Sequence, residues 1–254
     1  LTVARLGGVF GVLAVLLALS SGAWSQSREA AVQKALDDFV ATHGIVGASI
    51  AVLERDGTAY STGSGFMDRE KRVPAGPSTI YRLGSISKPV TAVAAMKMVE
   101  AGKLSLFADV RRFVPEWPDK GATLTLRHLL THTSGIRHYV PLKRDVYFEP
   151  FTVQRSLDVF KDDALLFPPG QRVSYSTHAF SLVARMVEIA SGERFDEFVQ
   201  AHLSKPAGSN TLALEDRARL DPNRSQLYTK PATGDATLEA RAENISWKNG
   251  GGGL

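Results

Sequence analysis

The segment Ser85–Ala101 constrains the fold more than any other part of the chain. It opens with Ser85-Ile86-Ser87-Lys88 and is apolar on nearly every side as far as Lys97. A helix without a polar face needs other elements to cover it, so this run predicts a helix buried between two layers. Pro89 suits a first helical turn but disfavours helical torsion angles at Lys88, so the sequence does not define where the helix begins.

Ser85 and Lys88 have the spacing of a nucleophile and its base. On a helix, a Lys three residues after a Ser lies about one turn further along the same face, so its ammonium can reach the hydroxyl. In an apolar setting such a Lys loses part of its preference for the charged form and can accept the proton. Backbone N–H groups at the helix start can stabilise an oxyanion. By itself the pattern fits a solvated Ser and Lys equally well.

The composition excludes several classes of site. The chain has 254 residues, enough for one large domain or two lobes that share a core. The absence of Cys excludes disulfides, thiolate metal sites and a lipoprotein anchor. The net charge is only +4 and the basic residues are scattered, so we expect no nucleic-acid partner.

Residues 1–25 differ from the rest of the chain. Arg5 is their only charge, Leu6–Leu19 is apolar, and the small residues of Ser20–Ser25 offer a cleavage site before Gln26. A membrane-spanning helix needs about 20 apolar residues, so the segment predicts a secretory signal peptide, with an uncleaved anchor as the alternative. We therefore expect a periplasmic or secreted mature chain, 26–254, that has no membrane contact after cleavage.

The remaining patterns predict a short sheet followed by helices. Arg28–His43 is an amphipathic helix, and Val46–Leu53 and Thr58–Phe66 are strands joined by a hairpin at Asp56-Gly57. From Ala108 onward the periodicity is helical. The helices expected there are Leu124–Leu130 (capped by Thr123 or Thr125), Thr152–Leu166, Phe180–Ala190 and Phe195–Leu203.

Three motifs occur in an order that a known family shares. Ser85-Ile86-Ser87-Lys88 comes first, and Arg127-His128-Leu129-Leu130-Thr131-His132-Thr133-Ser134-Gly135 follows. Then Pro169-Gly170 leads into Tyr175-Ser176-Thr177. Residues 30 to 254 thus resemble the β-lactamase-related serine hydrolases, which include class C β-lactamases, D-alanyl-D-alanine carboxypeptidases and esterases. Ser134–Tyr139 and Asp162–Phe167 are most similar to the mitochondrial serine β-lactamase-like branch and its bacterial relatives.

The resemblance implies a role for each matching residue. Ser85 is the acylated nucleophile, Lys88 accepts or relays its proton, and Tyr175 carries a proton between nucleophile and leaving group. The backbone N–H of Ser85 forms half of the oxyanion hole. Thr177 stands where many relatives have a substrate-binding Asn, and a hydroxyl is a poorer mimic of an amide, so the substrate preference is open.

The resemblance also implies an α+β fold, in which an antiparallel sheet with the N-terminal helix packs against an all-helical lobe. The family's third motif lies on a later strand, so we expect 26–254 to be one hydrolase domain, incomplete at its C-terminus. Lys248-Asn249-Gly250 is the alternative third motif, although it lies in a glycine run without strand character.

Other candidate residues favour structural roles. His128 and His132 are four residues apart but have no third partner at a plausible spacing, so we expect no metal and no other cofactor. Ser134 fits a turn cap. Tyr60-Ser61-Thr62 duplicates Tyr175-Ser176-Thr177, but it lies in the hairpin and predicts a strand-packing Tyr.

Together these features predict an exported serine hydrolase that takes a small-molecule or peptide substrate. A peptidase or an esterase is favoured over a β-lactamase. The alternatives are a non-catalytic penicillin-binding-like receptor and an inactive fragment, and the oligomeric state is open.

Overall fold

The computed structural model describes residues 26–55, 57, 59–140, 149–209, 211–215, 221–229, 238–239 and 245–254. The chain divides into two compact units, Leu1–Tyr81 with Asp221–Arg241 and Arg82–Leu220 with Ala242–Leu254. The predicted signal peptide, 1–25, lies outside the described residues. Within the described part, every helix is too short or too polar to cross a bilayer.

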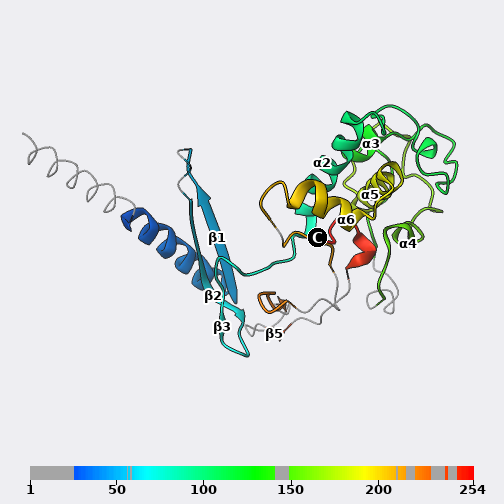
Figure 1. Cartoon of the computed structure of the whole chain (residues 1–254). Coiled ribbons are helices and arrows are strands. Elements are labelled where there is room, and N and C mark those ends of the chain that lie inside the picture. Colours follow the sequence, from blue (N-terminus) through cyan, green and yellow to red (C-terminus); the bar gives the residue numbers. More distant parts are fainter. Residues whose placement is uncertain are drawn as a thin grey trace, which may run out of the picture. The chain divides into compact units, whose positions relative to one another are not determined.

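The first unit contains a helix and a small antiparallel sheet (Figure 1). The helix covers residues 26–43. Strand β1 (Gly47–Leu53) pairs with β2 (Ala59–Asp68), and β2 pairs with the two-residue β3 (Val73–Pro74). The ladder ends at the pair Leu53 and Ala59, and Gly57 between them has a φ of +87°, which glycine adopts readily, so the predicted hairpin is confirmed. The sequence did not predict β3, which is too short to show a periodic pattern.

The N-terminal helix packs through part of its predicted apolar face. Leu36 and Val40 are buried, whereas Phe39 is 51% exposed and contacts the ring of His43. Gln33 donates from its side chain to the carbonyl of Gly63 in β2. Two further strands, β4 (Tyr228–Thr229) and β5 (Leu238–Glu239), pair with each other in the same unit.

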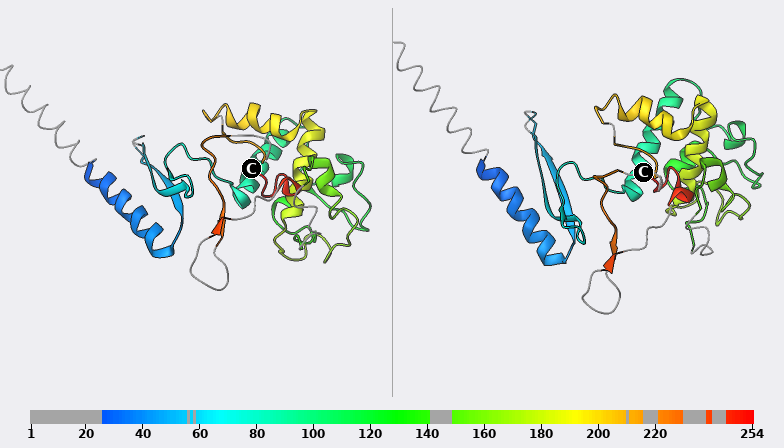
Figure 2. Two further views of the ribbon diagram at one scale, coloured as in Figure 1. Left: turned by 90° about the horizontal axis from the view of Figure 1, so that it is seen from below. Right: turned by 60° about the horizontal axis from the view of Figure 1, so that its bottom comes forward.

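The second unit is helical, and Figure 2 gives two further views of the chain. Its α-helices are α2 (Ser87–Glu100), α3 (Leu126–Leu130), α4 (Val153–Leu157), α5 (Thr177–Ser191) and α6 (Phe195–Val199). Shorter turns are η1 (Gly84–Ile86), η2 (Val110–Arg112), the π-helical η4 (Gln200–Ser204) and η5 (Ser246–Lys248).

Side-chain caps set where α3 and α4 begin. Thr125 accepts from the N–H of His128, so Thr125 is the cap of α3, and Thr123 is not. Thr152 caps α4 in the same way, but that helix ends at Leu157, and the prediction of a helix through Leu166 is wrong. The chain beyond α4 forms turns that bury Phe160.

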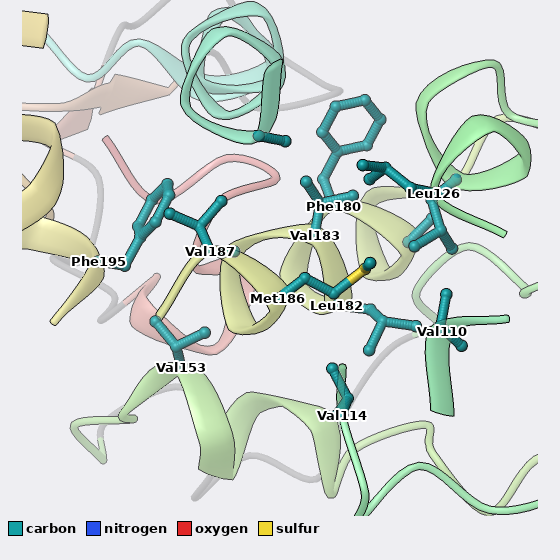
Figure 3. Close-up of a cluster of buried hydrophobic side chains, with 14 of the residues drawn as sticks. Val110, Val114, Leu126, Val153, Phe180, Leu182, Val183, Met186, Val187 and Phe195 are labelled. Atoms are coloured by element: carbon teal, nitrogen blue, oxygen red, sulfur yellow. The ribbon is translucent and has the colours of Figure 1, made fainter. Parts of the chain in front are cut away.

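The centre of the second unit is α5. Its residues Leu182, Val183, Met186 and Val187 have no exposed surface, and other elements surround them (Figure 3). By contrast α2 buries only one side. Val93 and Met96 are 52% and 42% exposed, so part of the apolar surface of α2 is uncovered among the described residues, and its burial between two layers stays a prediction.

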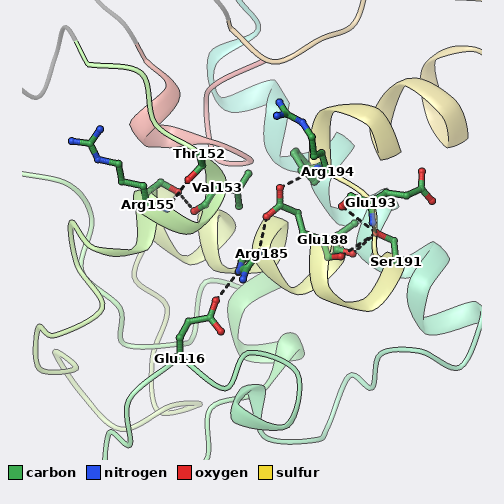
Figure 4. Close-up of polar contacts among 12 residues, drawn as sticks. Glu116, Thr152, Val153, Arg155, Arg185, Glu188, Ser191, Glu193 and Arg194 are labelled. Atoms are coloured by element: carbon green, nitrogen blue, oxygen red, sulfur yellow. Dashed lines mark hydrogen bonds and ion pairs between the residues drawn. The ribbon is translucent and has the colours of Figure 1, made fainter.

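Charged side chains fix the C-terminal half of α5. Arg185 lies between Glu116 and Glu188, at 2.7 and 3.2 Å (Figure 4). Glu188 also accepts from the N–H of Phe195 at the start of α6, which ties the two helices together.

Candidate active site

The turn η1 presents Ser85 at the start of α2. Gly84 has a φ of +54°, and η1 continues directly into α2 at Ser87, so Pro89 lies in the first turn of α2, where proline is tolerated. Ser85 is exposed, while Lys88, three residues on, is only 5% exposed. The Nζ of Lys88 donates to the Oγ of Ser85 at 3.3 Å, so the predicted pairing is confirmed.

Lys88 has further contacts around its ammonium. It donates to the carbonyl of Gly251 and lies 4.7 Å from the ring centre of Tyr175 and 5.8 Å from that of Phe180. A carbonyl oxygen and aromatic faces are favourable neighbours of a cation. These contacts hold the buried Lys88 within reach of the hydroxyl of Ser85.

Tyr175 completes the group. Its Oη lies 2.7 Å from the Oγ of Ser85, although the two residues are 90 positions apart. Burial raises the pKa of the Tyr175 phenol, but hydrogen bonds with Lys88 and Ser85, together with the Lys88 charge, outweigh burial. The net pKa is therefore lower than the ordinary value of 10.0, which makes the phenolate more accessible.

Thr177 follows Tyr175 by two positions. It is the first residue of α5 and only 3% exposed, and its hydroxyl is one of the groups that lower the pKa of Tyr175. The side chain therefore supports the phenol. A direct contact between Thr177 and a substrate stays a prediction.

The glycine run forms the wall beside these residues. A Cβ at Gly251 would lie 2.4 Å from the carbonyl oxygen of Thr177, so only glycine allows this approach. The hydroxyl of Thr91 donates to the carbonyl of Gly250, and the N–H of Leu254 donates to the Oγ of Ser87. This contact of the glycine run with the site was not predicted from the sequence, although consecutive glycines often indicate a close backbone approach.

Lys248-Asn249-Gly250 does not lie on a strand. Lys248 ends η5, and its Nζ lies 4.8 Å from the ring centre of Tyr139 and 4.5 Å from that of Trp247. Asn249 is buried and donates to the carbonyl of Phe151. The segment thus lacks the setting that the family's third motif requires.

Two histidines of the second unit contact Tyr175. The ring centres of His132 and His138 lie 4.6 and 5.4 Å from that of Tyr175. The described residues contain no group of three side chains able to hold a metal ion. Ser134 is buried and its Oγ accepts from the N–H of Ile136, so its predicted role as a turn cap is confirmed.

Comparison with known proteins places this geometry in a family. The family described as Beta-lactamase matches residues 32–254. The human mitochondrial serine beta-lactamase-like protein LACTB is 30% identical over 263 residues, covering 76% of this chain and 47% of the relative. Esterase EstB of Burkholderia gladioli is 30% identical over 199 residues, covering 72% and 50%. The chain thus spans about half the length of these curated relatives.

Solved structures agree on the fold. The penicillin-binding protein of Bacillus halodurans superimposes with a TM-score of 0.65 at 28% identity, covering 75% of this chain and 59% of the other. The predicted α+β fold of β-lactamases and penicillin-binding proteins is therefore confirmed. With its matching sequence, its fold and the meeting of Ser85, Lys88 and Tyr175, the chain belongs to the Beta-lactamase family.

Proposed function

We propose that this chain forms the acyl-enzyme of a serine hydrolase that acts on ester, amide or lactam carbonyls. One observation carries the proposal. The Oγ of Ser85 lies 2.7 Å from the Oη of Tyr175 and 3.3 Å from the Nζ of Lys88. A hydroxyl held between a phenol that can take its proton and an ammonium that stabilises the phenolate is an arrangement suited to covalent catalysis.

Acylation begins at the exposed hydroxyl of Ser85. Its oxygen forms a bond to the substrate carbonyl carbon while its proton passes to the phenolate of Tyr175. The carbonyl electron pair moves to oxygen and makes an oxyanion. The N–H of Ser85, in the first turn of η1, is one of the groups without an intrahelical acceptor and can donate to that oxyanion.

The tetrahedral species then collapses. The carbonyl forms again, the bond to the leaving alcohol or amine breaks, and Tyr175 returns its proton to that group. In the second half, water attacks the acyl ester, gives a proton to Tyr175 and releases the acid, while Ser85 regains its proton. Lys88 stabilises the phenolate throughout, since its charge lowers the pKa of Tyr175.

The similar proteins and the exposure of Ser85 and Tyr175 support the choice of substrate class. An esterase and a penicillin-binding protein are among the similar proteins, and Ser85 and Tyr175 are open to solvent. Because the chain spans about half of its curated relatives, the substrate of the whole protein is itself a proposal. We favour a small ester or peptide over a lactam, and propose that nucleic acid is not a partner.

Covalent labelling tests the nucleophile. A fluorophosphonate probe should add to the complete protein, and peptide mass spectrometry should place the adduct on Ser85. Ser85→Ala should abolish the adduct, whereas Ser61→Ala, at an exposed position of β2, should leave it intact. An adduct that persists in Ser85→Ala would refute the assignment.

Turnover distinguishes a hydrolase from a receptor. A hydrolase releases chromophore from a chromogenic ester over many cycles, whereas a penicillin-binding-like receptor stops after one equivalent. A single burst with the wild-type protein would therefore support the receptor and exclude the hydrolase.

We further propose that the protein is exported, with cleavage near Ser25, and works in the periplasm or outside the cell. The composition of residues 1–25 supports this. N-terminal sequencing of the mature protein should begin near Gln26, and material that retains residues 1–25 would favour the membrane anchor.

A further inference from the structure

Two imidazoles hold the turn that carries Tyr175. The Nδ1 of His132 accepts from the backbone N–H of Ser176 at 3.2 Å, and the Nδ1 of His138 accepts from that of Thr177 at 3.2 Å. These are the two peptide groups that follow Tyr175 directly. Both hydrogen bonds therefore act on the backbone that orients the phenol.

The segment 132–137 also holds this turn through two of its backbone carbonyl groups. The N–H of Ser174, just before Tyr175, donates to the carbonyl of His132 at 2.8 Å, and the Oγ of Ser176 donates to the carbonyl of Arg137 at 3.0 Å. His132 adopts a φ of +59°, unusual for a residue with a side chain, and such conformations persist only where the surroundings hold them.

The hydrogen bonds fix the protonation state of both rings. A backbone N–H can only donate, so each Nδ1 must carry a free lone pair and each proton must be on Nε2. A protonated imidazole has no acceptor at all. The two contacts therefore exist only while both rings are neutral.

Burial and nearby cations both oppose protonation of the two rings. Burial is the main cause that lowers the pKa of His132 and of His138, and the Lys88 cation is the next. His138 also lowers the pKa of His132. Lys248 acts on His138 as a further cation.

Other groups line the same region. Tyr175 contacts both rings, and Tyr139 contacts that of His138 at 3.9 Å between centres. His178 is buried, and its pKa falls to about 3 through burial, followed by the charges of Arg137 and its other neighbours. Arg137 itself forms an ion pair with Asp163.

We propose that neutral His132 and His138 are positioning residues that hold the phenol of Tyr175 on Ser85, and that protonation of either ring releases the turn and stops acylation. This inference rests on the proposed function. It adds an acid-sensitive control that lies outside the three reacting side chains.

Paired substitutions separate the hydrogen bond from the ring. In His132→Asn and His138→Asn the amide oxygen can replace Nδ1 as the acceptor, and it does not titrate. In His132→Leu and His138→Leu the acceptor is lost. We expect each Leu variant to acylate about tenfold to a hundredfold more slowly, since a misplacement of about 1 Å can cost that much, and each Asn variant to recover most of the loss.

The pH profile supplies a readout that packing alone does not move. With the wild-type protein, the acylation rate should fall more steeply in the range below pH 6.5, the ordinary pKa of an imidazole, than above it, because burial and the Lys88 cation lower the pKa of both rings. The double Asn variant should lose this extra steepness. His202→Asn, at a residue of the same unit that pairs with Glu193, should leave the whole profile unchanged.

Nitrogen NMR of the imidazoles tests the inference without any activity. Both rings should show an unprotonated Nδ1 and a protonated Nε2 at neutral pH. A proton on either Nδ1 would overturn the positioning role even if Ser85 is labelled. Failure of wild-type labelling would instead refute the proposed function, whatever the tautomers. An acid limb of equal steepness in wild type and the double Asn variant would also overturn the inference.

Discussion

The tripeptide Tyr-Ser-Thr occurs twice in this chain, and the two copies have different surroundings. Tyr60-Ser61-Thr62 lies in β2, where the three residues pair with Val52, Ala51 and Ile50 of β1. Tyr175-Ser176-Thr177 lies at the start of α5, where the Tyr contacts Ser85. The same tripeptide thus lies in a strand of one unit and beside Ser85 in the other.

The difference comes from neighbours that are distant in sequence. The phenol of Tyr175 has the hydroxyl of Ser85, a buried ammonium and two imidazoles around it. In the β2 copy, the hydroxyl of Thr62 donates to Gln33 of the N-terminal helix, a contact that links a helix to a sheet. A short motif therefore gains chemical meaning only from what the fold places beside it.

The tyrosines should give the largest contrast. Tyr175→Phe removes the group that accepts the proton of Ser85, so we expect acylation by an ester substrate to slow by about a hundredfold to ten-thousandfold. Tyr60→Phe alters a strand residue and should leave the rate unchanged. Stopped-flow measurement of both variants tests this. Equal losses in the two would mean that Tyr175 has no role in proton transfer.

The coupling between Lys88 and Tyr175 sharpens the same contrast. Lys88→Met alone should slow acylation by about a hundredfold or more, as expected for a group that tunes proton transfer. Lys88 and Tyr175 act as a unit with Ser85. The double variant Lys88→Met/Tyr175→Phe should therefore lose less acylation rate than the product of the two single losses. The double variant Lys88→Met/Tyr60→Phe should acylate at the same rate as Lys88→Met alone. Fully multiplicative losses with Tyr175→Phe would show that the two groups work separately.

The meeting of Ser85, Lys88 and Tyr175 could be predicted because motif order constrains these residues strongly. Ser85 and Lys88 are one helical turn apart, and the resemblance supplied Tyr175, which no local pattern could connect to residues 90 positions away. Periodicity indicated where helices lie, although α4 ends earlier than predicted, at Leu157. The sequence left the cap of α3 open between Thr123 and Thr125, and it placed Thr152 inside its helix, whereas Thr152 is the cap.

Features that depend on close packing were not predictable in this way. The glycine run contacts the site through its backbone, so it carries no side-chain signal. The two imidazole contacts join residues 44 and 39 positions apart, and His132 has a positive φ, neither of which a periodic pattern shows. The partial exposure of α2 likewise depends on which elements cover it.

The serines should differ in stability more than in rate. The Oγ of Ser176 accepts from the N–H of Ala179 as the cap of α5, so Ser176→Ala should lower the free energy of unfolding by about 1 kcal/mol. Ser61 is exposed on β2, and Ser61→Ala should change the free energy of unfolding by less than about 0.5 kcal/mol. Denaturant titration of both variants measures this, and equal midpoints would contradict the capping role.

The threonines should give the smallest contrast, and its sign follows from the pKa of Tyr175. The hydroxyl of Thr177 is the last of the groups that lower this pKa, so Thr177→Val should raise it. If the phenolate is the reactive form, the rising limb of the acylation profile should move to higher pH. The loss at neutral pH should stay within about tenfold, because one hydrogen bond contributes only about 0.5–1.5 kcal/mol. Thr62→Val loses a contact with Gln33 and should leave the limb in place. A limb that moves to lower pH in Thr177→Val, or that moves equally in both variants, would show that Thr177 does not stabilise the phenolate.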